Sequence, residues 1–444
     1  MLRSQTWWCD FNARELLRAL RLRSLGQTCG DWVCWEILLN YDAGVSSPSD
    51  ITLMAFLLIA VCLILDAPVQ EHTSPTAPPE ASNHEHPPAR SYAGVDACGP
   101  CHGEKVETFL RTAHYLTSRL PDSRSISGSF SPGRNILKTS NPELFFRMDA
   151  NSKGYFQTAV EGMPPYTTFR TERLDFVVGS GGKGQTYLFW KGDQLFQLPV
   201  SYWTQLGEWV NSPGYKDGVA NFGRPVIPRC LECHATFFES QSPPANRYRR
   251  IGYVLGIVCE KCHGPSGEHV ERAHSKSQAV LAQTIVNPAR LSRQRQIDLC
   301  AWCHAGAGEP VAATFSYAPG EPLDKYLKLP RSDPTVALDV HGNQVELLER
   351  SRCFQSSAMT CSSCHDVHAP QHDLARFAEG CLTCHKAENC GVYRKRGREI
   401  VNRCVDCHMP NQESNLIVSE VNGRSVRPRV RNHWIKVYPA TLNP

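Results

Sequence analysis

One five-residue pattern, Cys-x-x-Cys-His, occurs seven times in the chain and constrains its fold more than any other feature. The two intervening residues place both thiols on one turn, and the histidine follows directly. This spacing is the attachment signature of c-type haem, in which the thiols bond to the porphyrin edge and the histidine becomes an axial ligand of the iron. The cysteines are Cys98, Cys101, Cys230, Cys233, Cys259, Cys262, Cys300, Cys303, Cys361, Cys364, Cys381, Cys384, Cys404 and Cys407, and the histidines are His102, His234, His263, His304, His365, His385 and His408.

Zinc is the main alternative for paired cysteines. A structural zinc site needs cysteine pairs but has no need for a histidine after every second cysteine. All seven pairs carry that histidine, and a thioredoxin-like redox motif would occur once. The sequence therefore predicts seven covalently bound haem c groups.

The composition is that of a globular protein, with 444 residues, 41% hydrophobic and 20% charged. Each ferric haem with its two propionates adds a charge of roughly −1, so the formal charge of +4 becomes mildly negative on loading. No concentrated basic face indicates nucleic acid. Because each macrocycle buries apolar surface, we expect a mainly α and irregular multihaem cytochrome c fold over residues 94–444, which does not form without haem.

The N-terminal residues are expected to lie outside that domain. Residues 1–50 contain a short basic amphipathic segment and are interpreted as a piece upstream of a true start at Met54, or as part of the protein. Residues 51–67 hold a fifteen-residue apolar run, short of the ~20 of a full span, and are predicted to be a signal peptide or membrane anchor. A Pro-rich linker follows over residues 68–93. These features predict an extracytoplasmic, for example periplasmic, location.

The longest segment between motifs, from Cys101 to Cys230, has a different sequence pattern from the rest of the chain. Short aromatic and β-branched runs alternate with turn signals, which predicts an antiparallel β-rich insertion at about residues 138–210. We expect a meander of five or six strands over 144–150, 155–160, 166–170, 174–178, 185–190 and 195–200.

A second axial ligand on each iron distinguishes an electron carrier from a catalyst, because a six-coordinate iron has no open site. Three histidines lie in the linker and are expected to be exposed. Of the remaining histidines outside the motifs, the candidate distal ligands are His114, His269, His341, His368, His433 and, with less support, His274 and His372. His269 and His368 follow their own motifs so closely that they are expected to serve a neighbouring haem.

Two cysteines of the haem domain, Cys353 and Cys390, lie outside the motifs. In an oxidising compartment an even pair favours a disulfide over two free buried thiols.

The strings CEKCHGP with His269, CSSCHDVH at 361–368 and CVDCHMP at 404–410 resemble those of multihaem c-type cytochromes. The most similar group is the one related to octahaem hydroxylamine oxidoreductase and to its tetrahaem electron-acceptor cytochrome. The resemblance covers residues 94–440 and implies that His114, His269, His341, His368 and His433 are distal ligands. The chain has seven sites rather than eight, no Cys-x-x-Cys-Lys motif and no match for the tyrosine that crosslinks to the catalytic haem. These departures weigh against catalysis.

The function predicted from the sequence is electron transfer between extracytoplasmic redox partners. The partners expected are redox proteins, such as a quinol-oxidising or terminal reductase complex, with no nucleic acid and a membrane tether through residues 51–65. The alternatives are reduction or oxidation of a small nitrogen or sulfur oxyanion at one open haem, and a structural role in a larger respiratory complex.

Overall fold

The computed structural model describes residues 91–273, 277–330, 332–333 and 337–439, all within one unit of the chain, His86–Pro444. The expected N-terminal segment 1–50, the apolar segment 51–67 and nearly all of the linker 68–93 lie outside the described residues, as does His274. None of the described helices is both long enough and apolar enough to cross a membrane.

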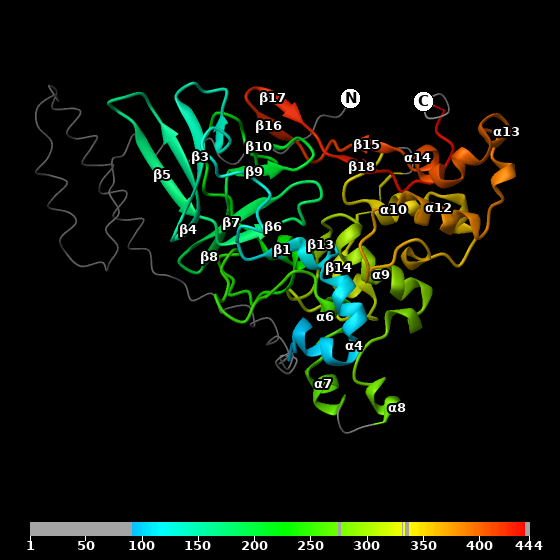
Figure 1. Ribbon diagram of the computed structural model, residues 1–444. Coiled ribbons are helices and arrows are strands. Elements are labelled where there is room, and N and C mark those ends of the chain that lie inside the picture. The colour runs from blue at the N-terminus through cyan, green and yellow to red at the C-terminus, as the bar shows by residue number, and fades with distance from the viewer. Residues whose placement is uncertain (1–90, 274–276, 331, 334–336, 440–444) are drawn as a thin grey trace, which may run out of the picture. The chain divides into compact units, whose positions relative to one another are not determined.

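One four-stranded antiparallel sheet has the order β2-β3-β4-β5 (Figure 1). The strands are Ile136–Lys138, Leu144–Asn151, Gly154–Glu161 and Thr168–Arg173. Alternate side chains of β3, namely Leu144, Phe146 and Met148, are fully buried, because successive residues of a strand point to opposite faces. This apolar face forms the core of the β-rich part.

A second four-stranded antiparallel sheet has the order β1-β6-β7-β8. Its strands are Ser118–Arg119, Phe176–Val178, Thr186–Lys191 and Gln194–Gln197, and the hairpin of β9 (Val200–Trp203) with β10 (Glu208–Asn211) follows. Buried aromatic residues of the two sheets and the hairpin, including Phe146, Tyr187 and Trp209, share one core cluster.

The prediction of a single meander is wrong, because the structure divides the strands between these two sheets. The strand β5 is exposed over most of its length, so it offers no apolar face on which a sixth strand could extend the layer. The chain instead turns at the buried Leu174, and β6 pairs with β1.

Outside the sheets the described chain forms short helices, small hairpins and irregular segments. Four motifs lie at the ends of helices, with the motif histidine as the last helical residue. The helices are α5 (Pro228–His234), α6 (Cys259–His263), α9 (Arg293–His304) and α14 (Cys404–His408). The first motif lies within α4 (Val95–Phe109), the fifth begins on the 3₁₀ turn η4 (Cys361–Ser363), and the sixth begins at the end of α12 (Leu374–Leu382).

The end of the chain returns to the β-rich part. The hairpin of β16 (Ser419–Val421) and β17 (Arg424–Val426) packs beside β10 (Figure 1). The Asp217 carboxylate accepts hydrogen bonds from the backbone N–H of Gly423 (2.8 Å), from that of Ser140 (3.1 Å) and from the Asn211 side chain (2.9 Å). One carboxylate therefore connects three separate segments.

Candidate functional site

Four helices, α5, α6, α9 and α14, carry the two cysteines and the histidine of a motif at their ends. Residues three apart lie on the same face of a helix, so the two cysteines of a motif face one way and the histidine follows them. In α9 the side chain of Ser292 accepts a hydrogen bond from the backbone N–H of Arg295 and begins the helix, which ends one residue before Ala305. The sequence thus uses helix ends to direct the thiols and the imidazole.

Three motif histidines face a histidine from elsewhere in the chain at nearly the same spacing. The ring-centroid distances are 6.2 Å for His304 and His114, 6.2 Å for His263 and His368, and 6.3 Å for His365 and His433. In each pair the second histidine comes from outside the motif of the first.

This spacing fits a metal held between two imidazoles. Metal–nitrogen bonds of about 2.0–2.1 Å on both sides, with roughly 1.1 Å from each nitrogen to its ring centre, place the two centroids about 6.3 Å apart. The three pairs would therefore hold haem iron from both sides and leave it without an open position.

His234, the histidine of the second motif, has a different candidate partner. Its side chain is exposed, yet burial lowers its pKa, and His341 lowers the pKa further. The ring therefore lies among surrounding protein groups, and His341 is near it. His341 is therefore the candidate second ligand, and the Asp339 carboxylate supports it by accepting hydrogen bonds from the backbone N–H of His341 (2.8 Å) and from the Ser414 hydroxyl (2.8 Å).

Hydrogen bonds fix the orientation of several of these imidazoles. The Nδ1 atom of His263 donates to the backbone carbonyl of Val286 (2.8 Å). The other rings with an Nδ1 partner are those of His234 (Thr117 hydroxyl), His269 (Thr284 hydroxyl), His365 (Gln371 carbonyl), His408 (Lys436 carbonyl) and His433 (Arg431 carbonyl). A carbonyl partner accepts a hydrogen bond from Nδ1–H, which fixes the tautomer and leaves Nε2 as the ligating nitrogen. A hydroxyl partner holds the direction of the ring.

Packing keeps His304 and His433 neutral. Burial, together with the nearby His114, lowers the pKa of His304 to about 4. Burial also lowers the pKa of His433 to about 4, with a further contribution from His365. A ligating imidazole must be unprotonated, so the rings are in the required form at neutral pH.

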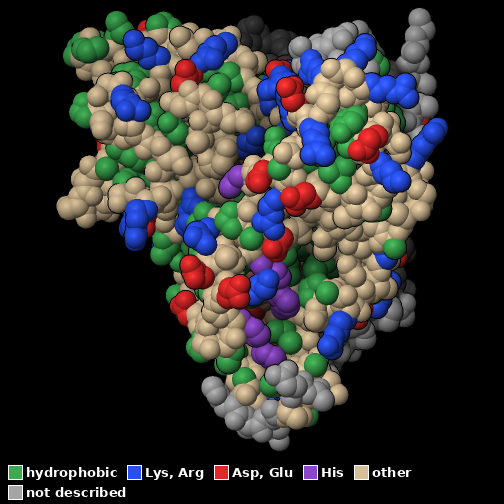
Figure 2. Space-filling view, turned by 45° about the vertical axis from the view of Figure 1, so that its right-hand side comes forward, with side chains coloured by type: hydrophobic (Ala, Val, Ile, Leu, Met, Phe, Trp, Pro, Cys, Tyr) green, Lys and Arg blue, Asp and Glu red, His purple; other side chains and the backbone are tan. Residues whose placement is uncertain are grey.

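The remaining motif histidines, His102, His385 and His408, face no imidazole at this spacing within the described ranges. His102 interrupts the helical geometry of α4 and lies near His263, as does His269. His269 is therefore positioned for the first motif, because His368 already faces His263 of the third. His372 is exposed. Figure 2 shows several histidine side chains along one recessed strip of the surface.

Contacts between cysteines give the order in which neighbouring motifs meet. Three pairs of thiols from different motifs are in side-chain contact: Cys98 with Cys259, Cys233 with Cys303, and Cys300 with Cys361. Cys381 of the sixth motif lies near Cys364 of the fifth and Cys404 of the seventh, and Cys262 lies near Cys300. The motifs thus form the series first, third, fourth, fifth, sixth, seventh, with the second joined to the fourth.

The disulfide predicted between Cys353 and Cys390 is not formed, since both cysteines are free. Cys353 lies near Cys364 and Cys381, whereas Cys390 lies near Cys404. Each unpaired thiol is therefore placed against the attachment cysteines of a motif rather than against the other.

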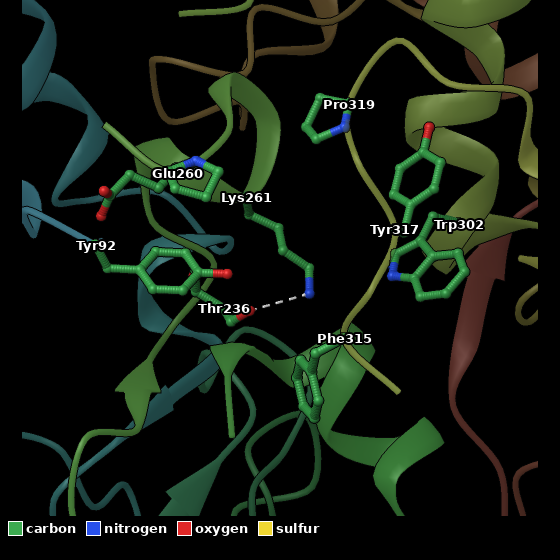
Figure 3. Close-up of a pocket in the computed structure, with 9 residues that line it drawn as sticks. Tyr92, Thr236, Glu260, Lys261, Trp302, Phe315, Tyr317 and Pro319 are labelled. Atoms are coloured by element: carbon green, nitrogen blue, oxygen red, sulfur yellow. Dashed lines mark hydrogen bonds between the residues drawn. The ribbon is translucent and has the colours of Figure 1, made fainter. Parts of the chain in front are cut away.

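A small cavity lies where motif turns pack together (Figure 3). The side chain of Lys261 extends into it and donates to the backbone carbonyl of Thr236 (3.3 Å), and Trp302 stacks on Tyr317 on the opposite side. Its volume of about 20 Å³ has room for about one water molecule. This cavity belongs to the packing between motifs and is too small for an organic substrate. In the described part of the chain, no three or more His, Cys, Asp or Glu are grouped to hold a separate metal ion.

The side chains that orient the ligands could not be identified from the sequence. Thr284, Gln371 and Asp339 lie 15, 6 and 2 residues from the histidines they contact. Only Gln371 and Asp339 are close enough in sequence to their histidines for a local motif to link them. Asp and Gln are common in loops, so neither residue type stands out as a partner of a ligand.

Comparison with known proteins gives one family match. Residues 216–264 match the family "Cytochrome c554 and c-prime", a segment that contains the second and third motifs. A curated relative, "Dissimilatory sulfite reductase MccA" of Wolinella succinogenes, is 20% identical over 72% of this chain and 50% of its own length. The chain therefore spans about half the length of this relative.

Two solved structures are similar to the fold. The "Outer Cell Wall Cytochrome OcwA" is 18% identical, with a TM-score of 0.49 over 78% of this chain and 79% of that one. The "Undecaheme cytochrome from S-layer of Carboxydothermus ferrireducens" is 16% identical, with a TM-score of 0.39 over 79% of this chain and 53% of that one. Taken with the motifs and the facing imidazoles, the family match supports haem c as the cofactor and a multihaem c-type cytochrome as the class of the protein.

Proposed function

We propose that the protein is a seven-haem electron carrier that passes electrons between extracytoplasmic redox partners. When bound, each haem c supplies a one-electron carrier at its attachment site. The observation that carries the proposal is the spacing of 6.2–6.3 Å in three imidazole pairs, because irons held on both sides by histidine have no position for a substrate.

The contacts between motifs support the same function. Each motif in the series has a cysteine in contact with, or near, a cysteine of the next motif. Because the porphyrin edge begins at the thioether sulfur, close cysteines require close ring edges. The chain thereby holds its haem groups in a connected series. A protein that only stored haem would not need such a series.

The apolar segment 51–67 supports export, and with residues 51–65 as a tether the carrier would work at a membrane surface. A quinol-oxidising or terminal reductase complex is then the expected class of partner.

The test is a redox titration followed by electron paramagnetic resonance. We expect seven haems per chain whose ferric signals are low-spin, with reduction spread over a range of potentials because their surroundings differ. The proposal would be contradicted if the haems were mainly high-spin, or if the protein held fewer haems than the seven that the motifs predict.

A second candidate is reduction of a small oxyanion at one open haem. Two observations favour it. The relative is named a sulfite reductase, and in the described part of the chain His102, His385 and His408 face no imidazole at the spacing of the other pairs. Addition of sulfite to the ferric protein distinguishes the two: a high-spin signal that converts on binding supports the reductase, and an unchanged low-spin spectrum supports the carrier.

A further inference from the structure

The sixth and seventh motifs lie at one end of the series of attachment sites, and their connecting segment is exposed. Cys384 and His385 of the sixth motif are both exposed. The connection runs through η5 (Ala387–Asn389), α13 (Tyr393–Arg396) and η6 (Gly397–Arg403), and η6 contacts α12 and α14, which carry the two motifs. This segment therefore covers the surface over the last two sites.

The connecting segment is strongly basic. Residues 386–403 contain six basic and two acidic side chains, a net charge of +4, and all eight are exposed. The basic residues, called here the basic surface, are Lys386, Arg394, Lys395, Arg396, Arg398 and Arg403. Within the described ranges only Arg403 forms an ion pair, with Asp406 (3.2 Å). Figure 2 shows Lys and Arg side chains gathered on this side of the molecule.

The opposite end of the series has the opposite charge. The helices α4 and α7 (Gly267–Ala273), which carry the first motif and His269, contain five acidic and two basic side chains, a net charge of −3. The two ends of the electron path therefore attract partners of different charge.

We propose that the basic surface is the docking site of an acidic redox protein, which exchanges electrons with the haems of the sixth and seventh motifs. This proposal rests on the proposed function of electron transfer. Several unpaired cations on one short segment repel each other, and an acidic partner relieves that repulsion while its field directs the approach. Docking here places the partner over the exposed sixth attachment site, so the electron enters or leaves at the end of the series.

The test compares two electron donors of opposite charge on the haem-loaded protein. The acidic donor is reduced plant-type ferredoxin, and the cationic donor is the methyl viologen radical. The surface variant is Arg394→Gln/Lys395→Gln/Arg396→Gln. The matched control, Lys153→Gln/Lys183→Gln/Lys191→Gln, removes the same charge from exposed lysines of the β-rich part.

At low salt we expect ferredoxin to reduce the surface variant at least about tenfold more slowly than the wild type. The variant should also bind ferredoxin correspondingly more weakly, as measured by fluorescence anisotropy. Methyl viologen should reduce it at the wild-type rate or slightly faster, and its haem spectrum should be unchanged. The control should resemble the wild type. The difference should fade at high ionic strength, because salt screens exposed charges.

Three results would overturn the docking site. Equal ferredoxin rates and affinities for the surface variant and the control would show that this surface is not used. Slower reduction by both donors, or lost haem, would show that the arginines serve the haem propionates. A wild-type dimer in light scattering that the surface variant abolishes would assign the surface to a second copy of the chain. A wild type that neither donor reduces would instead refute electron transfer itself.

Discussion

At the scale of single residues, the account depends on which imidazole faces which motif. The pairs join residues distant in the chain, such as His114 with His304. Because each ring in these pairs faces a different motif histidine, loss of one distal histidine is expected to affect one iron and leave its neighbours in place.

The substitution His433→Ala is expected to convert the haem of the fifth motif to high spin. His433 lies 6.3 Å from His365, centroid to centroid, and no other described histidine faces that ring. About one haem in seven should change in the electron paramagnetic resonance spectrum, and added imidazole should restore the low-spin signal. An unaltered spectrum would show that His433 is not the ligand.

The substitution His341→Ala is expected to act in the same way on the second motif, since His341 is the imidazole that affects His234. The matched control is Asp339→Asn, which keeps the histidine but weakens the hydrogen bond to its backbone N–H. We expect a high-spin haem in the first variant and a mainly low-spin spectrum in the second. High spin in neither variant would remove His341 from the ligand set.

The sequence identifies the motif residues, because attachment chemistry dictates their local spacing, and it leaves few other histidines as candidate distal ligands. The role of each of these histidines stays a prediction. His368 faces His263 of another motif, in line with the expectation that it serves a neighbouring haem. Which motif it would face could not be predicted, because that depends on contacts between distant segments. His274 lies outside the described residues, and its role stays a prediction.

At the scale of elements, buried carboxylates connect the segments that carry the motifs. Glu260, between the cysteines of the third motif, is 3% exposed and accepts hydrogen bonds from the backbone of Ala93 (2.8 Å), Gly94 (3.0 Å) and Ser266 (3.0 Å). It thereby holds the start of α4 against the third motif.

The substitution Glu260→Gln is expected to lower the free energy of unfolding by about 2 kcal/mol, because hydrogen bonds to a charged group contribute about 1.5–3 kcal/mol each. The control Glu268→Gln removes an exposed ion pair with Arg272 and should cost less than about 1 kcal/mol. Denaturant unfolding measures both, and hydrogen exchange should show faster opening of α4 in the first variant only. Equal stabilities would contradict this role.

Asp217 predicts a pH dependence of stability. Burial raises the pKa of its carboxyl, but the hydrogen bonds from Gly423, Asn211 and Ser140 outweigh burial and leave the pKa below the ordinary 3.8. The folded protein therefore binds the proton less well than the unfolded chain. This stabilisation is complete above the unfolded pKa and is lost as the pH falls through the lowered one.

The variant Asp217→Asn should accordingly be less stable than the wild type by about 1–3 kcal/mol at neutral pH, and the difference should shrink as the pH falls below about 4. Unfolding curves at several pH values measure it. Asp193→Asn, at an exposed ion pair with Arg247, is the control. A difference that does not change with pH would show that the carboxylate charge is not involved.

The strands were predictable as elements, because the six aromatic and β-branched runs overlap β3 to β9. Their division into two sheets was not, since it depends on β1 pairing with β6 across the chain. The free state of Cys353 and Cys390 was also unpredictable, because the expectation of export from residues 51–67 does not say which thiols are neighbours.

At the scale of the whole molecule, the fourth motif is the centre of the series. Its cysteines contact those of the second and fifth motifs and lie near that of the third, and α9 contributes Ile297 and Trp302 to a buried cluster. The first motif lies at the end and contacts the third.

Removal of the central attachment site with Cys300→Ala/Cys303→Ala should therefore lower the Tm more than removal of the terminal one with Cys98→Ala/Cys101→Ala. Each variant loses one haem, but the first loses packing with more neighbours. Thermal unfolding followed by circular dichroism, with haem content checked by absorbance, measures the difference. The reverse order would contradict the series of motifs.

The most direct test of the central claim is the intact mass of the purified chain after extraction with acid acetone. Porphyrin joined through pairs of cysteine sulfurs stays with the polypeptide, so we predict a mass increase of seven haems over the sequence of the mature chain, with seven irons by elemental analysis. Pigment that is extracted completely, or zinc in place of iron, would contradict it.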